Sequence, residues 1–494
     1  MKRPVFIDVL VIALLTFIAC DKRPADPGDE SDSVPAEWWK SMGSVMRYMP
    51  GQDSLTAQQI ASNLDSLKSD GFNVIHITAP YHSPGFTPWW GLRVTDYFDI
   101  NRDLGSAMTD FTYLVDECHS RGMPIIAFIN LNYGDPSSAI WIKAASDRSN
   151  GINSPESNYF LFSDTNSGTP GSNEYFGNDG SWVWSSEANS YYWSFWRSEG
   201  LAEPSYNWGS QDWRDYAASV VTFWMDTGID GLIIDAVHFM LNCDMSIMRT
   251  YVTDVINSYP NSLSIPEGGG AYNDDPVGWI TQGGFNGIDH QGLVSDWARI
   301  GQSVNYALAS GDPSPIEQAL VDYHDRVQDA GGVLWNYPKW YIFDRNDPKY
   351  RLLEVATMLS TGQMLDWRNE YTSRFPGWGE AQIDDLHAIM YAGSHNPALN
   401  PWGTRMKLST NNDNAYYAFK RSNGGQDVLV VLNYQNSSQN ITVNLSNSGI
   451  TTGQTPLELF TNTSGPIISS NSYTITLPAL GYAAYEVEVE GGTP

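Results

Sequence analysis

The sequence predicts an α/β protein built as a (β/α)8 TIM barrel, with an inserted subdomain after the third strand and a C-terminal antiparallel β-sandwich. Helix patterns followed by apolar strand patterns repeat along the first half of the chain, as in a parallel sheet with helices outside. After about residue 401 the pattern becomes period two, as in DVLVVLNY and AAYEVEVE, which is typical of short antiparallel strands. The length of 494 residues suggests two or three domains.

The N-terminus is expected to be an export signal. Lys2 and Arg3 precede an apolar run over residues 5–19, and Cys20 follows it. This arrangement is similar to a bacterial lipoprotein signal with Cys20 lipidated; an ordinary cleaved signal is the alternative. Residues 21–35, rich in Asp, Pro and Ser, are expected to be a flexible tether. The mature protein would then be exported and held at the membrane by the lipid alone, or secreted.

Three predicted helices, over residues 56–69, 107–121 and 213–227, each precede a strand pattern: GFNVIHITAP, GMPIIAFINLN and GIDGLIIDAVHF. Between residues 133 and 207 the alternation fails, and Gly, Ser, Asn, Trp and Tyr become frequent. We interpret that segment as an insertion on the catalytic face. The predicted domains are therefore a barrel of residues 36–132 and 208–400, an insert of residues 133–207, and a sandwich of residues 401–494.

Composition narrows the classes of partner. A formal net charge of −29 argues against nucleic acid and against an anionic membrane surface, but not against an anionic ligand in a locally basic pocket. The 19 Trp and 27 Tyr exceed what cores usually need, and their flat rings suit sugar faces. Cys118 and Cys243 each lie in an apolar pattern and are expected to be buried thiols. No metal-ligand cluster or phosphate-binding glycine loop is visible, so we expect neither metal nor cofactor.

Two acidic residues end strand patterns. Asp235 follows the apolar run of GIDGLIIDAVHF, and the carboxyl end of such a strand is where α/β proteins keep their chemistry. A helix N-cap is the alternative for Asp235. Glu267 follows LSIP in the same way, and a surface loop is its alternative.

The order GFNVIHITAPYHSP, WGLRVTDYFDINRDLGS, GMPIIAFINLNY and NWGSQDWRDYAASVVTFWMDTGIDGLIIDAVHF resembles glycoside hydrolase family 13, the α-amylase family. The resemblance covers roughly residues 40–490. The insert, with AASDRSN, SNYFLFSD and EPSYNW, is most similar to the oligo-1,6-glucosidase and trehalose synthase branch. The resemblance implies that Asp235 is the nucleophile and Glu267 the general acid/base of a retaining glycosidase, whose carboxylates lie about 5 to 5.5 Å apart.

Several positions depart from the family pattern. Ile233 stands where the family has an arginine two residues before the nucleophile, and Phe128 stands where it has that arginine's aspartate partner. Losing both members of a buried ion pair together leaves apolar packing, which can be neutral or stabilising. We therefore interpret the change as a rebuilt pocket.

Other departures lie among the expected sugar contacts. Tyr133 replaces the histidine of the third-strand motif beside a retained Asn132, and Leu92 and Arg93 replace a tyrosine and an aspartate that hold glucose. His238 lies one place short of the family's usual histidine. The residues that we expect to contact substrate are Arg93, Lys339, Asn132, Tyr133, His238 and Trp90.

The third catalytic carboxylate of the family has no clear counterpart. The register of LWNYPK puts Lys339 in its place, whereas a longer strand would end on Asp344. Asp347 is expected to cap the helix that begins at Pro348. His324 and Asp325 spell the family's dipeptide, but their surroundings have helical spacing and predict a solvated helix face.

These residues predict a retaining α-glycoside hydrolase with an altered sugar pocket, acting on an oligo- or polysaccharide. A basic residue at 93, and at 339 in the preferred register, suggests a sulfated or uronic sugar. The competing explanation is that Arg93 replaces the guanidinium lost at Ile233 and pairs with Asp235. A non-catalytic carbohydrate-binding barrel and an ordinary α-glucosidase or α-amylase remain the alternative functions.

Overall fold

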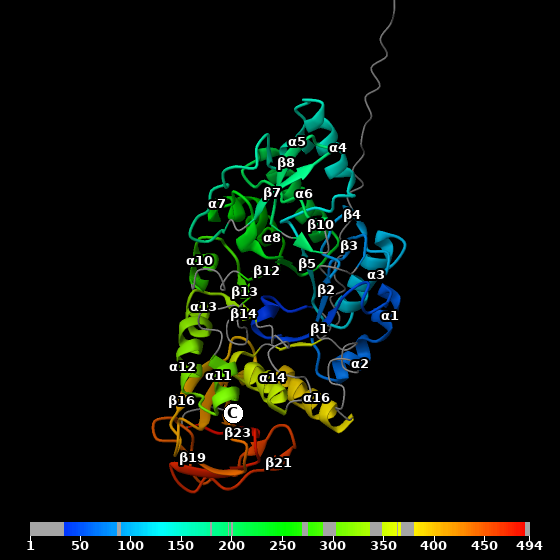
Figure 1. The fold of residues 1–494 in the computed structure, drawn as a ribbon. Coiled ribbons are helices and arrows are strands. Elements are labelled where there is room, and N and C mark those ends of the chain that lie inside the picture. The colour runs from blue at the N-terminus through cyan, green and yellow to red at the C-terminus, as the bar shows by residue number, and fades with distance from the viewer. Residues whose placement is uncertain are drawn as a thin grey trace, which may run out of the picture.

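The computed structural model describes residues 34–85, 90–177, 180–195, 197–198, 201–268, 275–289, 303–335, 348–362, 364–366 and 380–489. Figure 1 shows three parts along the long axis of the molecule. The insert with α4, β7 and β8 lies at one end, the parallel strands occupy the middle, and the C-terminal sheets lie at the other end.

The middle part is the predicted parallel barrel architecture. A six-stranded sheet runs in the order β12-β11-β5-β2-β1-β15, and a second, two-stranded sheet joins β13 to β14. Every pairing in these two sheets is parallel, and β13 lies in contact with β12. The strands are β1 (Ser44–Tyr48), β2 (Val74–Thr78), β5 (Ile125–Ile129), β11 (Gly231–Ile234), β12 (Leu263–Pro266), β13 (Gly287–Asp289), β14 (Val333–Trp335) and β15 (Met364–Asp366).

Strands β1, β2, β5, β11 and β12 are buried along their whole length, which explains their nearly continuous apolar sequences. The helix predicted over 56–69 is two helices, α1 (Ala57–Ser62) and α2 (Leu64–Ser69), separated at Asn63. Thr56 begins α1 with a capping box to Gln59. The helices predicted over 107–121 and 213–227 are α3 (Met108–His119) and α6 (Gln211–Asp226).

The second half of the barrel carries shorter helical pieces. They are α7 (Met245–Met248), η3 (Arg249–Thr253), α8 (Asp254–Asn257), α10 (Pro276–Thr281), α11 (Ser303–Ser310), α12 (Ser314–Leu320), η5 (Val321–Asp325), α13 (Arg326–Asp329), α14 (Pro348–Thr361) and α16 (Glu380–His395). Both η3 and η5 are π-helical.

The insert after β5 is an ordered subdomain rather than an irregular excursion. It contains helices α4 (Ala139–Ser149) and α5 (Pro155–Asn158) and an antiparallel sheet of β6 (Phe162–Ser163), β8 (Ser190–Ser194) and β7 (Ser181–Ser185). Trp141 of α4 packs on Phe160, Phe162 and Tyr192, with ring centroids 4.7 to 5.7 Å apart. The aromatic residues that sequence analysis assigned to sugar binding thus include a local core.

The C-terminal part is a β-sandwich with its own apolar core. One antiparallel sheet runs β16-β17-β18-β23-β20-β21, and β19 pairs with β22 in the other. The strands are β16 (Thr404–Leu408), β17 (Tyr416–Asn423), β18 (Gln426–Asn433), β19 (Gln439–Asn444), β20 (Leu457–Glu458), β21 (Thr463–Ser464), β22 (Ser472–Leu477) and β23 (Tyr482–Val487). The predicted fold class is therefore confirmed in both its parts.

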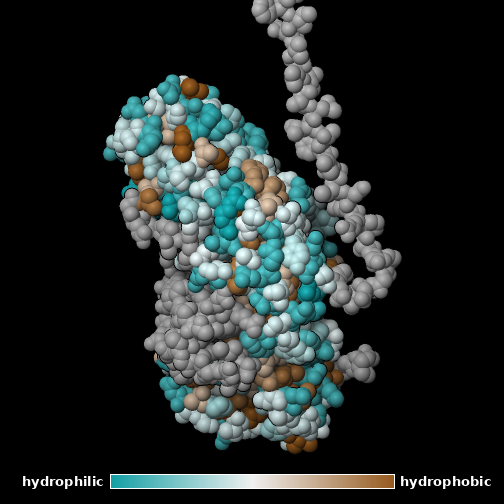
Figure 2. Space-filling model, turned by 90° about the vertical axis from the view of Figure 1, so that its right-hand side faces the viewer, coloured by the Kyte–Doolittle hydropathy of each residue, from teal (hydrophilic) through white to brown (hydrophobic). Residues whose placement is uncertain are grey.

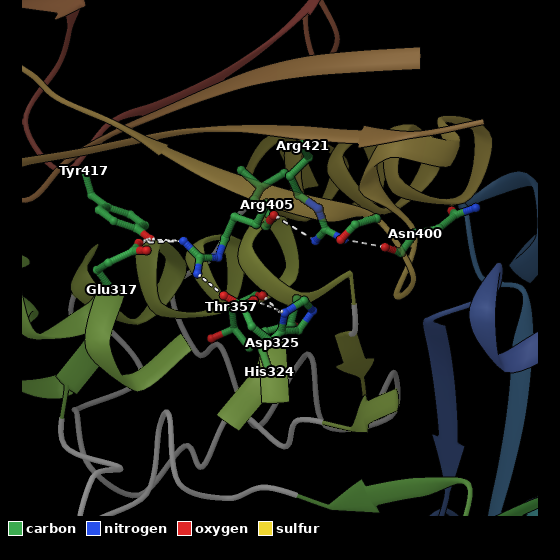
Figure 3. A network of polar contacts seen from close by, with 11 residues as sticks. Glu317, His324, Asp325, Thr357, Asn400, Arg405, Tyr417 and Arg421 are labelled. Atoms are coloured by element: carbon green, nitrogen blue, oxygen red, sulfur yellow. Dashed lines mark hydrogen bonds and ion pairs between the residues drawn. The ribbon is translucent and has the colours of Figure 1, made fainter. Parts of the chain in front are cut away.

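Figure 3 shows a polar network where the sandwich meets the helices of the barrel. Arg405 on β16 donates to Glu317 at 2.5 Å and to Asp325 at 2.8 Å, and His324 lies 2.9 Å from Asp325. His324 is buried, so the prediction of a solvated helix face is wrong. The sequence pattern could not reveal this, because the groups that cover the helix come from β16 and β17, far along the chain.

The described part of the chain has a mainly polar surface on the face shown in Figure 2, and two buried thiols inside. Figure 2 shows mainly hydrophilic residues on its face, with hydrophobic residues scattered among them. Cys118 and Cys243 are both buried free thiols, as predicted. Among the described residues, no helix has the length and hydropathy needed to cross a membrane. Residues 1–33, with the expected signal, Cys20 and most of the tether, lie outside the described part of the chain.

Candidate active site

Asp235 and Glu267 leave the barrel side by side. Strands β11 and β12 pair in register up to Ile234 and Pro266, so the next residue on each strand is one of the two acids. The amide of Glu267 donates to the carbonyl of Ile234 at 2.9 Å, and the amide of Asp235 donates to the carbonyl of Ile129 at 2.8 Å. The carboxyl ends of three adjacent strands thus hold the backbone of both acids.

The turn after β11 orients the second carboxylate toward the first. Ala236 adopts a left-handed conformation with φ 41°, which is unusual for a residue other than glycine. Its amide donates to Oε2 of Glu267 at 2.9 Å. The short helix η2 (Val237–Phe239) follows, and its N-cap is Ala236, without a side-chain cap. Asp235 is therefore not a helix N-cap, which was the alternative for this residue.

The electrostatics of Asp235 are those of a buried charge with a like neighbour. Burial and then the negative charge of Glu267 raise the pKa of Asp235 well above its usual range, and Arg47 opposes them. Glu267 is only partly buried. The structure therefore gives the two acids different degrees of burial.

Two phenols border the Asp235 carboxylate. Burial and then Asp235 raise the pKa values of both Tyr81 and Tyr133 well above 10, so both remain neutral donors. Tyr81 lies on β3 (Tyr81–His82), and its hydroxyl accepts from the amide of Asn130 at 3.2 Å. Tyr133 is buried and forms an antiparallel bridge with Ser205 of the insert.

Asn132 supports the backbone at Asp235. Its Nδ2 donates to the carbonyls of Asp235 at 2.7 Å and Ala236 at 2.9 Å. This amide group, expected to contact sugar, thus holds the strained turn. His238 lies in the same turn, and a Cβ added to Gly268 would meet its Cε1 at 2.8 Å. His238 is therefore packed against the residue that follows Glu267.

Arg93 forms ion pairs with Asp135 and Glu203, so it neither pairs with Asp235 nor faces an open pocket. Its Nη2 contacts the carboxylate of Asp135, and its Nε lies 3.1 Å from Oε1 of Glu203. Asp135 and Glu203 are buried, and the Arg93 side chain is 13% exposed. Burial raises the pKa of Glu203 to about 7, against the pull of Arg93. The proposed compensation of Asp235 by Arg93 is therefore wrong, and the guanidinium already has two carboxylates.

This Arg93 cluster, defined as Arg93, Asp135 and Glu203, joins three segments. Arg93 lies between β3 and β4 (Asp96–Ile100), Asp135 follows β5, and Glu203 follows β10 (Leu201–Ala202) of the insert. Backbone bonds between Gly134 and Pro204 and between Asp135 and Val94 tie the same segments together. The cluster and these bonds attach the insert to the wall of the site.

The remaining residues that were expected in or near the sugar pocket lie in different surroundings. Trp90 is 51% exposed, and Leu92 is buried. Ile233 and Phe128 are paired in register on adjacent strands and both are buried, in keeping with the apolar packing expected of them. Lys339 and Asp344 lie outside the described residues, as does Asp347.

Sequence reasoning missed four residues around the site: Arg47, Tyr81, Asp135 and Glu203. One signal was available for Arg47, because an arginine inside the buried strand SVMRY needs a reason to be there. Asp135 and Glu203 carried no such signal, since each becomes notable only when Arg93 lies between them. Within the described ranges, no group of His, Cys, Asp and Glu could hold a metal ion.

The fold and the paired strand-end carboxylates define a barrel of the glycoside hydrolase type. The sequence matches the family model described as alpha amylase, catalytic domain, over residues 51–270, and the maltogenic amylase C-terminal domain over residues 407–483. The chain belongs to the α-amylase family.

Individual relatives are distant. An oligo-1,6-glucosidase of Halalkalibacterium halodurans is 26% identical over 218 residues, which cover 43% of this chain and 37% of that protein. A trehalose-6-phosphate hydrolase of Bacillus subtilis is 22% identical over 466 residues, 84% of this chain and 76% of that protein. The structure of an alpha-amylase from H. orenii covers 91% of this chain and 100% of that one, with TM-score 0.70 and 18% identity. The chain thus spans little more than a third of the first relative.

Proposed function

We propose that the protein is a retaining α-glycoside hydrolase with a rebuilt sugar pocket. The observation that carries the proposal is the juxtaposition of Asp235 and Glu267 at the carboxyl ends of paired strands, where Glu267 accepts the amide of Ala236. In the proposed reaction Asp235 attacks the anomeric carbon while Glu267 gives its proton to the leaving oxygen. Glu267 then takes a proton from the water that releases the sugar from Asp235.

The partial exposure of Glu267 supports its role as the acid/base. Asp235 is buried beside the neutral phenols Tyr81 and Tyr133, and with its raised pKa it must lose its proton before it attacks. Glu267 is partly exposed, as a group that must exchange protons with a leaving group and with water should be. A non-catalytic barrel would have no need of a buried carboxylate beside a second one, because that arrangement costs stability.

Hydrolysis is expected to retain the anomeric configuration, because the two carboxylates serve as nucleophile and acid/base. Proton NMR of the first minutes of hydrolysis distinguishes the two products by the coupling of the anomeric proton. An α-anomer formed first supports the proposal. A β-anomer formed first would mean that water attacks directly and that Asp235 is no nucleophile.

Maltose, isomaltose and starch are expected to be poor substrates. Leu92 offers no polar group, and Arg93 already bonds to two carboxylates, so hydroxyls of a bound glucose would lose partners. Each buried unpaired polar group costs about 1 to 3 kcal/mol, and two such losses reduce turnover by about 30-fold or more. A kcat/KM for maltose as high as for the best substrate would contradict the rebuilt pocket.

The identity of the preferred sugar follows from the charge of the Arg93 cluster. With two carboxylates to one guanidinium, the cluster does not attract an anion, so the reason to expect a sulfated or uronic sugar no longer rests on Arg93. We propose a neutral glycosyl unit. A matched panel of neutral, sulfated, phosphorylated and uronic α-linked saccharides tests this, and a preference of tenfold or more for an anionic member would restore the charged-sugar hypothesis.

We further propose that the protein is exported and anchored through a lipid on Cys20. The basic start, the apolar run over residues 5–19 and the position of Cys20 motivate this. Expression of the full chain in a bacterial host should yield protein in the membrane fraction, and Cys20→Ser should move it to the soluble fraction. The same distribution for both forms would exclude the lipid anchor.

A further inference from the structure

Four aromatic side chains cover one face of the β7–β8 hairpin in the insert (Figure 1). Trp182 pairs in register with Trp193, and Trp184 with Tyr191. Residues opposite one another on antiparallel strands share a face, and successive residues alternate between faces, so all four rings lie on the same side. The ring centroids of the two pairs are 5.2 and 5.0 Å apart, and both pairs meet edge to face. These four residues are called the aromatic row below.

The aromatic row is not needed to build the core of the insert. The opposite face of the hairpin does that, because Tyr192 packs on Trp141 with ring centroids 4.7 Å apart and Val183 packs on the same core. Among the described residues, the two apolar cores do not include any ring of the row. Trp184 is 50% exposed, and Trp193 is the one member that is buried. A cluster of large rings on an outer face is typical of a binding surface.

The rings continue from the hairpin to the candidate active site. Directly after β8, the ring of Phe195 lies on that of Phe239 in η2, with centroids 3.8 Å apart. The Phe239 ring also contacts the imidazole of His238, again at 3.8 Å. His238 packs against the glycine that follows Glu267. Aromatic rings therefore lead from the exposed Trp184 to the turn beside the two carboxylates.

Hydrogen bonds fix the hairpin relative to the site. The amide of Ser205 donates to the carbonyl of Trp193 at 3.0 Å, and the amide of Phe195 donates to Oγ of Ser205 at 3.1 Å. Ser205 also bridges to Tyr133, which borders Asp235. From residue 191 to residue 195 the strand extends about 13 Å, which is more than the width of one sugar ring.

The chemistry of this surface suits a neutral sugar chain. Trp and Tyr have flat apolar faces with a polar group at one edge, which match the C–H face and hydroxyl rim of a pyranose. Arg148, which contacts Ser190 of β8, pairs with Asp164 at 2.5 Å. The exposed Glu187 in the hairpin turn adds a negative charge, which disfavours an anionic chain.

We propose that the aromatic row binds the part of a neutral α-linked sugar chain that extends beyond the scissile bond. The occupant is the substrate itself, because the rings continue to the carboxylates and the surface is uncharged apart from an acid. The preferred substrate is then an oligo- or polysaccharide rather than a disaccharide. This inference rests on the proposed function, but binding to the row can be tested without turnover.

The first test compares kcat/KM for a heptasaccharide with that for the disaccharide of the same linkage, as a ratio. Trp184→Ala should lower this ratio by about three- to tenfold, the scale of one lost aromatic contact. Trp184→Phe keeps a ring and should recover most of the ratio. Tyr113→Ala is the matched control, since Tyr113 is 44% exposed but lies on α3 of the barrel.

A ratio that Trp184→Ala leaves unchanged would overturn the proposal, and so would an equal fall in Tyr113→Ala. A fall that Trp184→Phe reverses supports it. Trp184→Gln also lacks the ring and should behave as Trp184→Ala does, which guards against a defect specific to alanine. Melting temperatures verify that each variant is folded.

The second test measures binding by native electrophoresis in gels that contain dextran, pullulan or α-mannan, with Asp235→Asn to prevent turnover. At least one polysaccharide should retard this protein, and adding Trp184→Ala should remove most of the retardation. No retardation by any of the three would contradict the proposal. If retardation depends on Trp184 but the wild-type protein hydrolyses no glycoside, the proposed function fails while the binding role of the row stands.

Sedimentation velocity without sugar tests a different occupant, a second copy of the chain. The wild-type protein and Trp184→Ala should sediment as the same species. Self-association that Trp184→Ala abolishes would assign the row to a contact between copies and would overturn its role in sugar binding.

Discussion

Asp235→Asn is expected to reduce kcat by about 10³-fold or more on every substrate that the wild-type protein hydrolyses. The amide cannot form the covalent intermediate, yet it has nearly the same volume. It leaves in place the bond from the backbone amide of residue 235 to Ile129 and the bond that the carbonyl of residue 235 accepts from the Asn132 side chain. Initial rates with a purified, folded variant measure the effect, with circular dichroism to verify the fold.

Asp230→Asn is the matched control for this loss. Asp230 lies just before the same strand, at its opposite end, where it accepts from the amide of Ile125 at 2.8 Å and pairs with His119. Its substitution is expected to lower stability and to leave kcat within about twofold, because it is remote from the strand ends that carry the chemistry. A comparable loss of kcat in both variants would mean that strand β11 had been disturbed and that Asp235 has no special role.

Arg93→Met is expected to destabilise the protein by about 3 to 5 kcal/mol at pH 8, because it leaves Asp135 and Glu203 buried without their cation. Burial raises the pKa of Glu203 to about 7, and loss of Arg93 raises it further. A carboxyl whose pKa is higher in the folded than in the unfolded state becomes destabilising as the pH rises through its folded value. The penalty should therefore be largest above pH 7 and smaller near pH 5.

Melting temperatures at pH 5 and pH 8 test this dependence. Combining Arg93→Met with Asp135→Asn and Glu203→Gln removes the stranded charges and should recover much of the loss. A penalty that is the same at both pH values, or that the additional substitutions leave unchanged, would show that the Arg93 side chain stabilises by packing instead of by charge.

The fold could be predicted because it depends on periodicity. Buried parallel strands have continuous apolar runs, whereas antiparallel strands of the sandwich alternate between exposed and buried residues. The two types of strand can therefore be distinguished in the sequence. The positions of Asp235 and Glu267 at strand ends follow from the same pattern, since a charged residue directly after an apolar run marks the edge of the sheet.

The charge partners could not be predicted in the same way, because they depend on which segments meet in space. Arg93 was expected either to bind substrate or to pair with Asp235, and it instead meets Asp135 and a glutamate of the insert. The burial of His324 has the same origin, since β16 supplies its surroundings.

The most direct test of the central claim is to trap the covalent intermediate. A fluorinated α-glycosyl fluoride, matched to the sugar found in the substrate panel, slows release of the sugar from the nucleophile, and peptide mass spectrometry then locates the attached sugar. One glycosyl unit per protein on Asp235, absent from Asp235→Asn, is the expected result. A glycosyl unit on another residue, or turnover of the fluoride with inversion and no adduct, would contradict the assignment of Asp235 as the nucleophile.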